Sequence, residues 1–152
     1  MATIDIDLAN LDRFRQLIVR LLYVITTVED PSTIRQLEQA FYQTEAQQFN
    51  TQGGLTGGWP PLKPRYQAWK DRNYPGLPMM VLTGRLRNSL ISRSGETIFM
   101  ADPQGLRIGT RVPYAMYHQF GTRTMQARPV VPMEAILDRM QRILEEYLRT
   151  QT

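Results

Sequence analysis

One stretch of fourteen residues limits the folds that this chain can adopt. Residues 51–64 read TQGGLTGGWPPLKP and contain four Gly, three Pro and one Trp. Glycine weakens helices and proline removes a backbone donor, so this stretch cannot continue a helix or a central strand. Long loops in compact domains are commonly functional or mobile. We therefore predict a flexible loop over residues 51–64, between a helical first part and a mixed second part.

The first part has two helical patterns. Before these helices, residues 2–7 alternate apolar and polar side chains, and this pattern predicts a short half-buried strand. Residues 9–28 then space their apolar side chains as an amphipathic helix does. Asp30 and Pro31 start a second helix, because aspartate caps helices and proline fits the first helical position. We predict that this second helix ends near Asn50.

Short elements follow the loop. Residues 65–72 predict one or two helical turns, and residues 73–78 (NYPGLP) predict another loop. Thr83 can cap a short helix that continues through Leu86 and Leu90. This part of the chain is therefore expected to contain short helices joined by turns.

The residues after position 91 have a β-strand pattern. Residues 98–100 (IFM) predict one strand, and apolar positions within residues 106–112 predict its neighbour. Residues 101–105 (ADPQG) between them are rich in turn-forming residues, so we predict an antiparallel hairpin. Residues 113–120 predict one or two helical turns, which Pro113 opens.

The end of the chain has the clearest helical pattern. Pro132 opens a predicted helix over residues 132–150, which must dock on the sheet or on another subunit because such a helix is not stable alone. Together these patterns predict one domain over residues 1–152, of the α+β class. A small, mostly antiparallel sheet packs against N-terminal and C-terminal amphipathic helices. The apolar stripe of the last helix consists of Met133, Ile136, Leu137, Met140, Ile143, Leu144, Tyr147 and Leu148.

The composition excludes several classes of protein. The chain has no cysteine, which excludes disulfides, thiol catalysis and zinc sites built on cysteine. No apolar run approaches the ~20 residues that span a bilayer, so no membrane contact is expected. The start, MATIDIDLAN, has acidic residues where a signal peptide has basic ones. We therefore expect synthesis in a cytoplasm.

The positive charge is concentrated in the middle of the chain. Residues 1–62 have four Arg and seven acidic residues, and residues 129–152 have three Arg and four acidic residues. Residues 63–128 have eleven Lys and Arg and only three acidic residues, a balance of +8. Three interpretations remain open: a solvated basic surface, contact with an acidic protein, or contact with a nucleic-acid backbone.

Catalytic patterns are weak. His118 is the only histidine, it stands beside aromatic residues, and the chain has no G-x-S-x-G element. Asp5 with Asp7, and Glu145 with Glu146, read as solvated surface pairs. The glycines of residues 53–58 have no following Lys-Ser or Lys-Thr, so no phosphate-binding loop is present. We predict no enzyme activity, no cofactor and no metal site; a hydrolase that uses His118 is a third, weaker hypothesis.

The order of motifs in the second half resembles a known family. The chain runs GGWPPLKPRY, VLTGRLRNSL, a predicted hairpin, VPYAMYHQFGT and MQARPVVP before the last helix. Over residues 55–148 this resembles the phage virion-morphogenesis, or tail-completion, proteins of Mu-like phages and their prophage relatives. The HQFG and ARP elements are the most specific. Two departures are Gln126, where the family has proline, and Val130, where it has an aromatic residue. The matching positions are Trp59, Pro61, Leu62, Leu82, Thr83, Gly84, Leu86, Arg87, Tyr114, Ala115, His118, Gln119, Phe120, Gly121, Ala127, Arg128 and Pro129.

The resemblance implies a structural virion protein of the head–tail junction, made and assembled in the bacterial host cytoplasm. It implies a homo-oligomeric ring, with a hexamer favoured and a dodecamer as the alternative. The expected partners are other copies of the chain, neighbouring neck or connector proteins, and tail tube or sheath proteins. The alternative function is a non-specific nucleic-acid-binding module that uses residues 63–128, and DNA in the channel could also contact the ring.

The site residues admit two roles. We predict that the YAMYHQFG segment, residues 114–121, is more scaffold than contact surface. Contacts with neighbours are predicted around Trp59 and over residues 123–129. The candidate interface or scaffold residues are Trp59, Arg87, Tyr114, His118, Gln119, Phe120, Arg123, Arg128 and Pro129.

Overall fold

The structure is a computed structural model, and it describes residues 30–102 and 105–151. The predicted strand at residues 2–7 and the predicted helix at residues 9–28 lie outside the described residues.

Helix α2 (Pro31–Asn50) has the predicted bounds. The Asp30 carboxylate accepts hydrogen bonds from the Ser32 and Thr33 backbone N–H groups at 3.3 and 3.0 Å, and Pro31 occupies the first turn. This cap satisfies donors that a helix start leaves unpaired. The inner face of α2 then provides Leu37, Phe41 and Phe49 to the core, and all three side chains are buried. The position of the helix is therefore determined both by its cap and by its packing.

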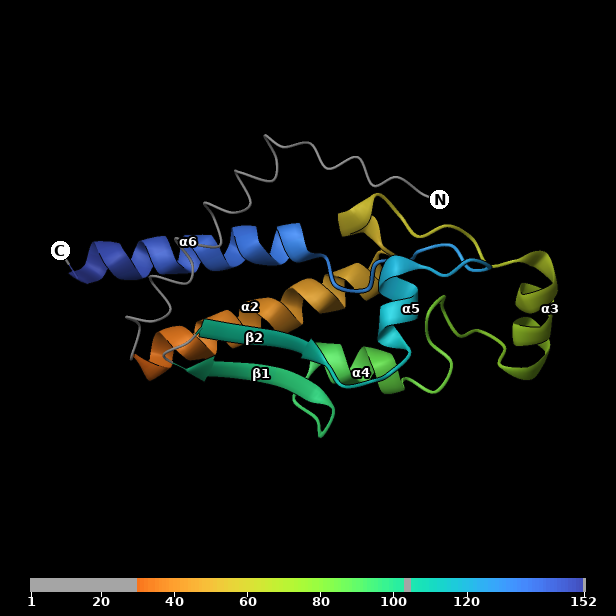
Figure 1. The fold of residues 1–152 in the computed structure, drawn as a ribbon, viewed down its shortest axis with the longest axis horizontal. Coiled ribbons are helices and arrows are strands. Elements are labelled where there is room, and N and C mark those ends of the chain that lie inside the picture. The colour runs from red at the N-terminus through yellow and green to blue at the C-terminus, as the bar shows by residue number, and fades with distance from the viewer. Residues whose placement is uncertain (1–29, 103–104, 152) are drawn as a thin grey trace.

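Helix α6 (Met133–Gln151) lies along α2 (Figure 1), and it begins one residue after the predicted start. Its stripe places Ile136, Met140 and Leu144 in the core. The Arg139 guanidinium also donates to the Thr44 hydroxyl of α2 at 2.9 Å. The α2–α6 pair is thus the main helical layer of the described residues.

Short helices connect this layer to the rest of the chain. A 3₁₀ turn, η1 (Gly54–Thr56), lies within the predicted loop, and α3 (Pro64–Asn73) contains the predicted turns at residues 65–72. Helix α4 (Arg85–Ile91) packs against α2. The N-cap residue of α4 is Gly84, at φ 79°, where a left-handed turn suits glycine. The predicted Thr83 lies one position earlier, and its hydroxyl accepts a hydrogen bond from the Arg85 backbone N–H at 3.3 Å.

The hairpin consists of β1 (Thr97–Asp102) and β2 (Gly105–Thr110), which are antiparallel. Pairing runs from Thr97 with Thr110 to Asp102 with Gly105, so both strands extend into the stretch predicted as a turn. Val112, predicted on the second strand, lies beyond β2 and is buried. Helix α5 (Ala115–Phe120) follows, within residues 113–120 as predicted.

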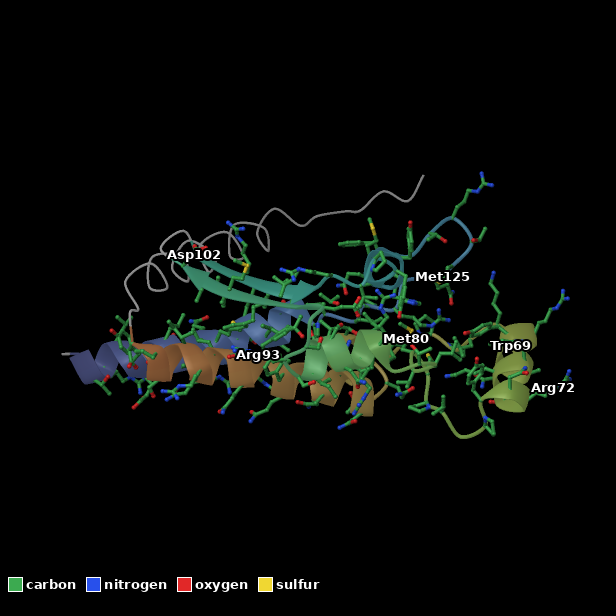
Figure 2. All side chains as sticks on the ribbon, turned by 90° about the horizontal axis from the view of Figure 1, so that it is seen from below. Trp69, Arg72, Met80, Arg93, Asp102 and Met125 are labelled. Carbon is green, nitrogen blue, oxygen red and sulfur yellow. The ribbon has the colours of Figure 1, made fainter. Side chains whose placement is uncertain are left out.

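The α+β prediction is confirmed. The hairpin covers one side of the α2–α6 layer, as the two views show (Figures 1 and 2), and Phe99, Leu106 and Ile108 pack against the core. Helix α3 lies at one end of the molecule, apart from this body. Within the described ranges, no helix is both long enough and apolar enough to cross a membrane.

Candidate functional site

Trp59 holds the Gly/Pro/Trp loop to the core. Its indole packs edge-on against Phe49, with ring centroids 5.4 Å apart, and its Nε1–H donates to the Pro129 carbonyl at 2.8 Å. The Gln48 amide donates to the same carbonyl, also at 2.8 Å. Glycine is required at position 53, because φ is 85° and a Cβ would lie 2.4 Å from the Trp59 ring. These contacts join the loop, α2 and the segment before α6.

Arg128 fixes the loop from its other side. The Nε of Arg128 donates to the Pro60 carbonyl at 2.8 Å, and an Nη donates to the Pro61 carbonyl at 2.7 Å. The Arg128 side chain is only 6% exposed, and this burial lowers the pKa of its guanidinium. In the subunit Arg128 therefore clamps its own loop, and its predicted contact with a neighbouring subunit stays a prediction.

The HQFG residues anchor the end of α5. The His118 carbonyl accepts a hydrogen bond from the Arg128 N–H at 2.7 Å. The Gln119 side chain pairs with the Val131 backbone twice, accepting at 2.8 Å and donating at 3.2 Å. Gly121 then turns the chain at φ 72°, where a Cβ would lie 2.8 Å from a backbone nitrogen of the following loop. Gln119 and Gly121 are therefore scaffold residues within the subunit.

Helix α5 has two different faces. Three large apolar side chains point to solvent: Met116 is 58% exposed, Tyr117 52% and Phe120 79%. Tyr114 and His118, on the other side, line a cavity. The scaffold role predicted for this segment thus applies to only part of it, since Phe120 contributes almost nothing to the core of the subunit.

That cavity has a volume of about 690 Å³. It lies where residues of the loop before α3, α3 itself, the loop that leads into α4 with its first turn, α5 and the loop after α5 meet. Much of its wall is apolar, with Leu62, Met80, Leu82 and Met125 among the lining residues. Met80 and Met125 both lie near the α3 end of the molecule (Figure 2). The volume is within the ~300–1,000 Å³ that is typical of ligand sites.

The charged residues of the cavity wall are all basic among the described residues. Arg85 has a carboxylate partner, Glu96, with Nε 2.9 Å from Oε2. Lys63, Lys70 and Arg128 instead donate to backbone carbonyls, and none of them forms an ion pair within the described ranges. The cavity therefore has three cations without a carboxylate partner among the described residues.

Lys70 is the most unusual of these cations, because its side chain is only 3% exposed. Burial lowers the pKa of the Lys70 ammonium group, and attraction to neighbouring Asp71 partly opposes this effect. Burying a charged group without an opposite charge is unfavourable. The cavity is thus electrostatically suited to an anion.

His118 does not form a catalytic arrangement with the groups described. Burial, and secondarily the charge of Arg128, lower the pKa of its imidazole. The ring meets Tyr114 edge-on, with centroids 6.0 Å apart, and the buried Nδ1 has no hydrogen-bond partner among the described residues. A triad needs a carboxylate or amide at this nitrogen to orient the base. In the same ranges, no group of three or more acidic or histidine residues could hold a metal.

Helix α3 exposes a second set of apolar side chains. The Tyr66 and Trp69 rings stack with centroids 5.5 Å apart, and Tyr74 tilts against Trp69 at 5.6 Å. All three rings are exposed, and Arg65 and Arg72 lie on the same helix. Helix α3 lies apart from the body (Figure 1), and the three rings are 38–44% exposed, so the aromatic cluster is accessible to solvent.

The exposed apolar face of α5 and the exposed aromatic cluster of α3 suit contact with other macromolecules better than they suit catalysis of a reaction. The phage virion morphogenesis family matches the chain over residues 9–147. The chain belongs to the phage virion morphogenesis family. A search of the curated proteins and a search of the solved structures each found no significant match. Family membership assigns a structural or assembly role in a phage virion, which points to a structural protein and away from an enzyme.

The candidate residues of this virion protein divide into three groups. Within the subunit, Trp59, Gln119, Arg128 and the Pro129 carbonyl form hydrogen bonds that hold the loop and α5 in place. Tyr114 and His118 line the cavity. At the surface, Phe120 and Arg123 are exposed and Arg87 is half-buried on α4. The structure therefore brings together the first two groups, whereas the third is spread over separate elements.

Sequence reasoning missed three residues, two of them at these sites and one, Glu45, in the interior of α2. Lys70 and Glu45 are buried ionisable groups, and Met116 extends the exposed face of α5. Lys70 follows Trp69 in an otherwise exposed, charged helix, so no pattern indicated its burial. For Met116, a helix of six residues is too short for its apolar spacing to identify the inner face.

Proposed function

We propose that this member of the phage virion morphogenesis family is a structural protein of the head–tail junction. In this proposal it assembles into a homo-oligomeric ring that joins or completes the tail. We favour a hexamer, with a dodecamer as the alternative, because tails are usually sixfold. We also propose that the protein is related to those of Mu-like phages and prophages, and that it is assembled in the bacterial cytoplasm.

The exposed apolar face of α5 carries the proposal. Contiguous exposed apolar groups on a small protein indicate a contact surface. Met116, Tyr117 and Phe120 form such a face, and Tyr114 and His118 on the other side of α5 line a cavity. A ring needs two different, complementary surfaces on each subunit, because its contacts are head-to-tail. The two faces of α5 offer one projecting surface and one concave surface.

The exposed aromatic cluster of α3, formed by Tyr66, Trp69 and Tyr74, supports contact with other virion proteins. Aromatic residues and arginine are enriched in protein interfaces. The cluster lies at the far end of the molecule from the start of α2 (Figure 1). The proposed partners at this end are neck or connector proteins, or tail tube or sheath proteins.

Phe120→Ser is expected to weaken self-association at least about tenfold, since a buried Phe side chain contributes roughly 1.5–3 kcal/mol to an interface. The stability of the subunit should change by less than about 0.5 kcal/mol, because Phe120 is 79% exposed. Mass photometry over a concentration series, with and without the neighbouring neck and tail proteins, measures the association. Thermal unfolding of the monomer measures the stability.

Met100→Ser is the matched control, because Met100 is an exposed apolar residue on β1. This variant should assemble as the unmodified chain does. Unchanged assembly of the Phe120 variant would remove α5 from the interface. A chain that stays monomeric and binds no neck or tail protein would disprove the head–tail junction role itself.

A second candidate function is non-specific contact with DNA, which the projecting α3 favours. The stacked pair Tyr66 and Trp69 lies beside Arg65 and Arg72, and aromatic rings next to cations bind single strands. We expect Arg65→Gln/Arg72→Gln to weaken binding of an oligonucleotide several-fold and to lower its salt dependence. Fluorescence anisotropy over a salt range of about 50 to 200 mM tests this. No binding at the lowest salt would dismiss the candidate.

A further inference from the structure

The cavity beside α5 offers a guest mainly apolar surface. Lys70 and Arg128 are nearly fully buried, and both already donate hydrogen bonds to backbone carbonyls of the chain. Neither group therefore needs an acceptor from outside. The rest of the wall includes Leu62, Met80 and Met125, and methionine side chains adapt their shape to a neighbour. An apolar guest would remove this part of the wall from water, which is favourable.

The positive charge of the wall favours an aromatic guest over an aliphatic one. The face of an aromatic ring attracts cations within ~6 Å of its centre. The wall already contains one such contact, because the Arg85 guanidinium lies 5.9 Å from the centre of the Tyr114 ring. The rim includes the exposed residues Lys63 and Tyr66, so a guest can enter from solvent. An apolar cavity of ~150 Å³ binds benzene, and about 690 Å³ therefore has room for several rings.

Helix α5 carries a projection of the matching kind on its far side from the cavity. Met116, Tyr117 and Phe120 form this exposed face. Met116 and Phe120 are four residues apart, as are Tyr114 and His118 of the cavity wall, so each pair shares one side of the helix. The two pairs are offset by two residues, which is ~200° around the helix axis. Phe120 therefore points away from the cavity of its own copy, and a cavity that receives it must belong to another copy.

We propose that the exposed face of α5 inserts into the cavity of a second copy of this chain, with the Phe120 ring against Met80 and Met125. This inference rests on the proposed ring function and deepens it, because it names the receptor of the exposed face. Every copy then provides one α5 and receives another. Such a contact is head-to-tail, and it can close into a ring.

The size of this contact favours a closed ring over a dimer. An aromatic side chain buries ~150–250 Å² when it is enclosed. At 52% and 79% exposure, Tyr117 and Phe120 thus offer roughly 200–330 Å² to a partner. A stable interface between two proteins buries ~800 Å² on each partner, so a single insertion is too small for a stable pair. A closed ring gives every copy two such contacts and leaves no α5 face without a receptor.

Photo-cross-linking identifies the surface that Phe120 contacts. The probe is the full-length chain with p-benzoylphenylalanine in place of Phe120, because this photo-reactive analogue keeps the aromatic ring. The probe chain is mixed with an isotope-labelled unmodified chain, with and without the neck and tail proteins. Mass spectrometry should find adducts between the probe chain and Leu62, Met80 or Met125 of the labelled chain. The same analogue in place of Met100, an exposed residue on β1, is the matched control and should give none of these adducts.

Other cross-linked products would overturn the proposal. Adducts between the α5 helices of two copies would show a two-fold contact, in which each exposed face meets its equivalent. Adducts only on the aromatic cluster of α3, or only on a neck or tail protein, would show a different receptor. The absence of any adduct between copies, with and without those proteins, would exclude the insertion.

Met125→Ser tests the apolar wall of the receptor. Met125 lines the cavity, so serine should weaken self-association about fivefold or more through the loss of apolar contact. Met133→Ser, at an exposed methionine on α6 outside the cavity wall, is the matched control and should leave association unchanged. Mass photometry measures association, and thermal unfolding checks that each variant folds. Equal losses in the two variants, or no loss in either, would overturn the cavity as the receptor; the cross-linking test needs neither variant.

The salt dependence separates this contact from nucleic-acid binding. Arg123 is exposed just after Phe120, and Lys63 lies at the rim, so two copies meet with like charges. Salt screens this repulsion, and association between copies should therefore stay constant or strengthen between about 50 and 200 mM salt, whereas DNA binding weakens. A loss of association of about tenfold over this range would overturn an apolar contact.

The outcomes for the insertion and for the ring differ. Rings that form without adducts in the cavity wall would disprove the insertion alone. Adducts in the cavity wall of a chain that forms open assemblies, but never a closed ring, would disprove the ring function and retain the contact.

Discussion

Glu45→Gln is expected to stabilise the chain by up to about 3 kcal/mol at pH 7. Glu45 lies on α2, is 0% exposed, and neither carboxylate oxygen has a hydrogen-bond partner among the described residues. Burial raises the pKa of this carboxyl to about 9 from 4.5. At pH 7 the folded chain must therefore keep a proton on Glu45 that the unfolded chain releases. This difference lowers the free energy of unfolding by ~1.4 kcal/mol for each pH unit above 4.5. Glutamine removes this cost.

The pH dependence has a definite sign. Because the pKa of Glu45 is higher in the folded state, its contribution to stability is fully present below pH 4.5. This contribution is lost as the pH rises from 4.5 to about 9. Urea unfolding at a series of pH values should show this decline in the unmodified chain and a flatter profile in Glu45→Gln. Glu146→Gln, at an exposed position on α6, is the control and should retain the decline. Identical profiles for the chain and its Glu45 variant would contradict the assignment.

Trp59→Ala is expected to destabilise the chain by about 3–5 kcal/mol, the usual range for removing a large buried aromatic residue. The change removes the packing against Phe49 and the hydrogen bond to the Pro129 carbonyl, and it leaves a hole beside Gly53. For a chain of this size the melting temperature should fall by about 6–20 °C. Calorimetry measures this change.

Trp59→Phe separates the two contributions. Phenylalanine keeps a ring beside Phe49 but lacks the indole donor, whereas Gln48 still donates to the Pro129 carbonyl. We therefore expect a loss of only about 1–2 kcal/mol. Equal losses in the two variants would show that the hydrogen bond, and not the packing, anchors the loop.

The elements with strong local signals were predictable from the sequence. Asp30 and Pro31 mark the start of α2, and the apolar stripe of α6 specifies its inner face. The N-cap residue of α4 is one position later than predicted, at Gly84, although the Thr83 hydroxyl still accepts a hydrogen bond from the first helical N–H. The hairpin turn was predicted too long, since alanine and aspartate at positions 101–102 are uncommon in strands and only pairing with β2 places them there.

The candidate sites were only partly predictable, because burial depends on residues that are distant in sequence. Trp59 and Arg128 were recognised, but their common role in holding the loop depends on contacts across about 70 positions of the chain. Phe120 belongs to the segment 114–121, which the sequence analysis predicts to be more scaffold than contact surface. In the structure, the short helix that bears Phe120 turns its ring to solvent. The cavity itself has no sequence signature, since residues from five segments contribute to it.

The double hydrogen bond to the Pro129 carbonyl has a consequence for the timing of folding. Its donors, in Gln48 and Trp59, are synthesised 81 and 70 residues before the acceptor. At ~5–20 residues per second, the ribosome needs roughly 4–14 s to add the later 70. During that interval the loop lacks its anchor, and Arg128 has not yet been added to the cavity wall. A nascent or truncated chain that ends before Arg128 therefore has neither an anchored loop nor a complete cavity wall.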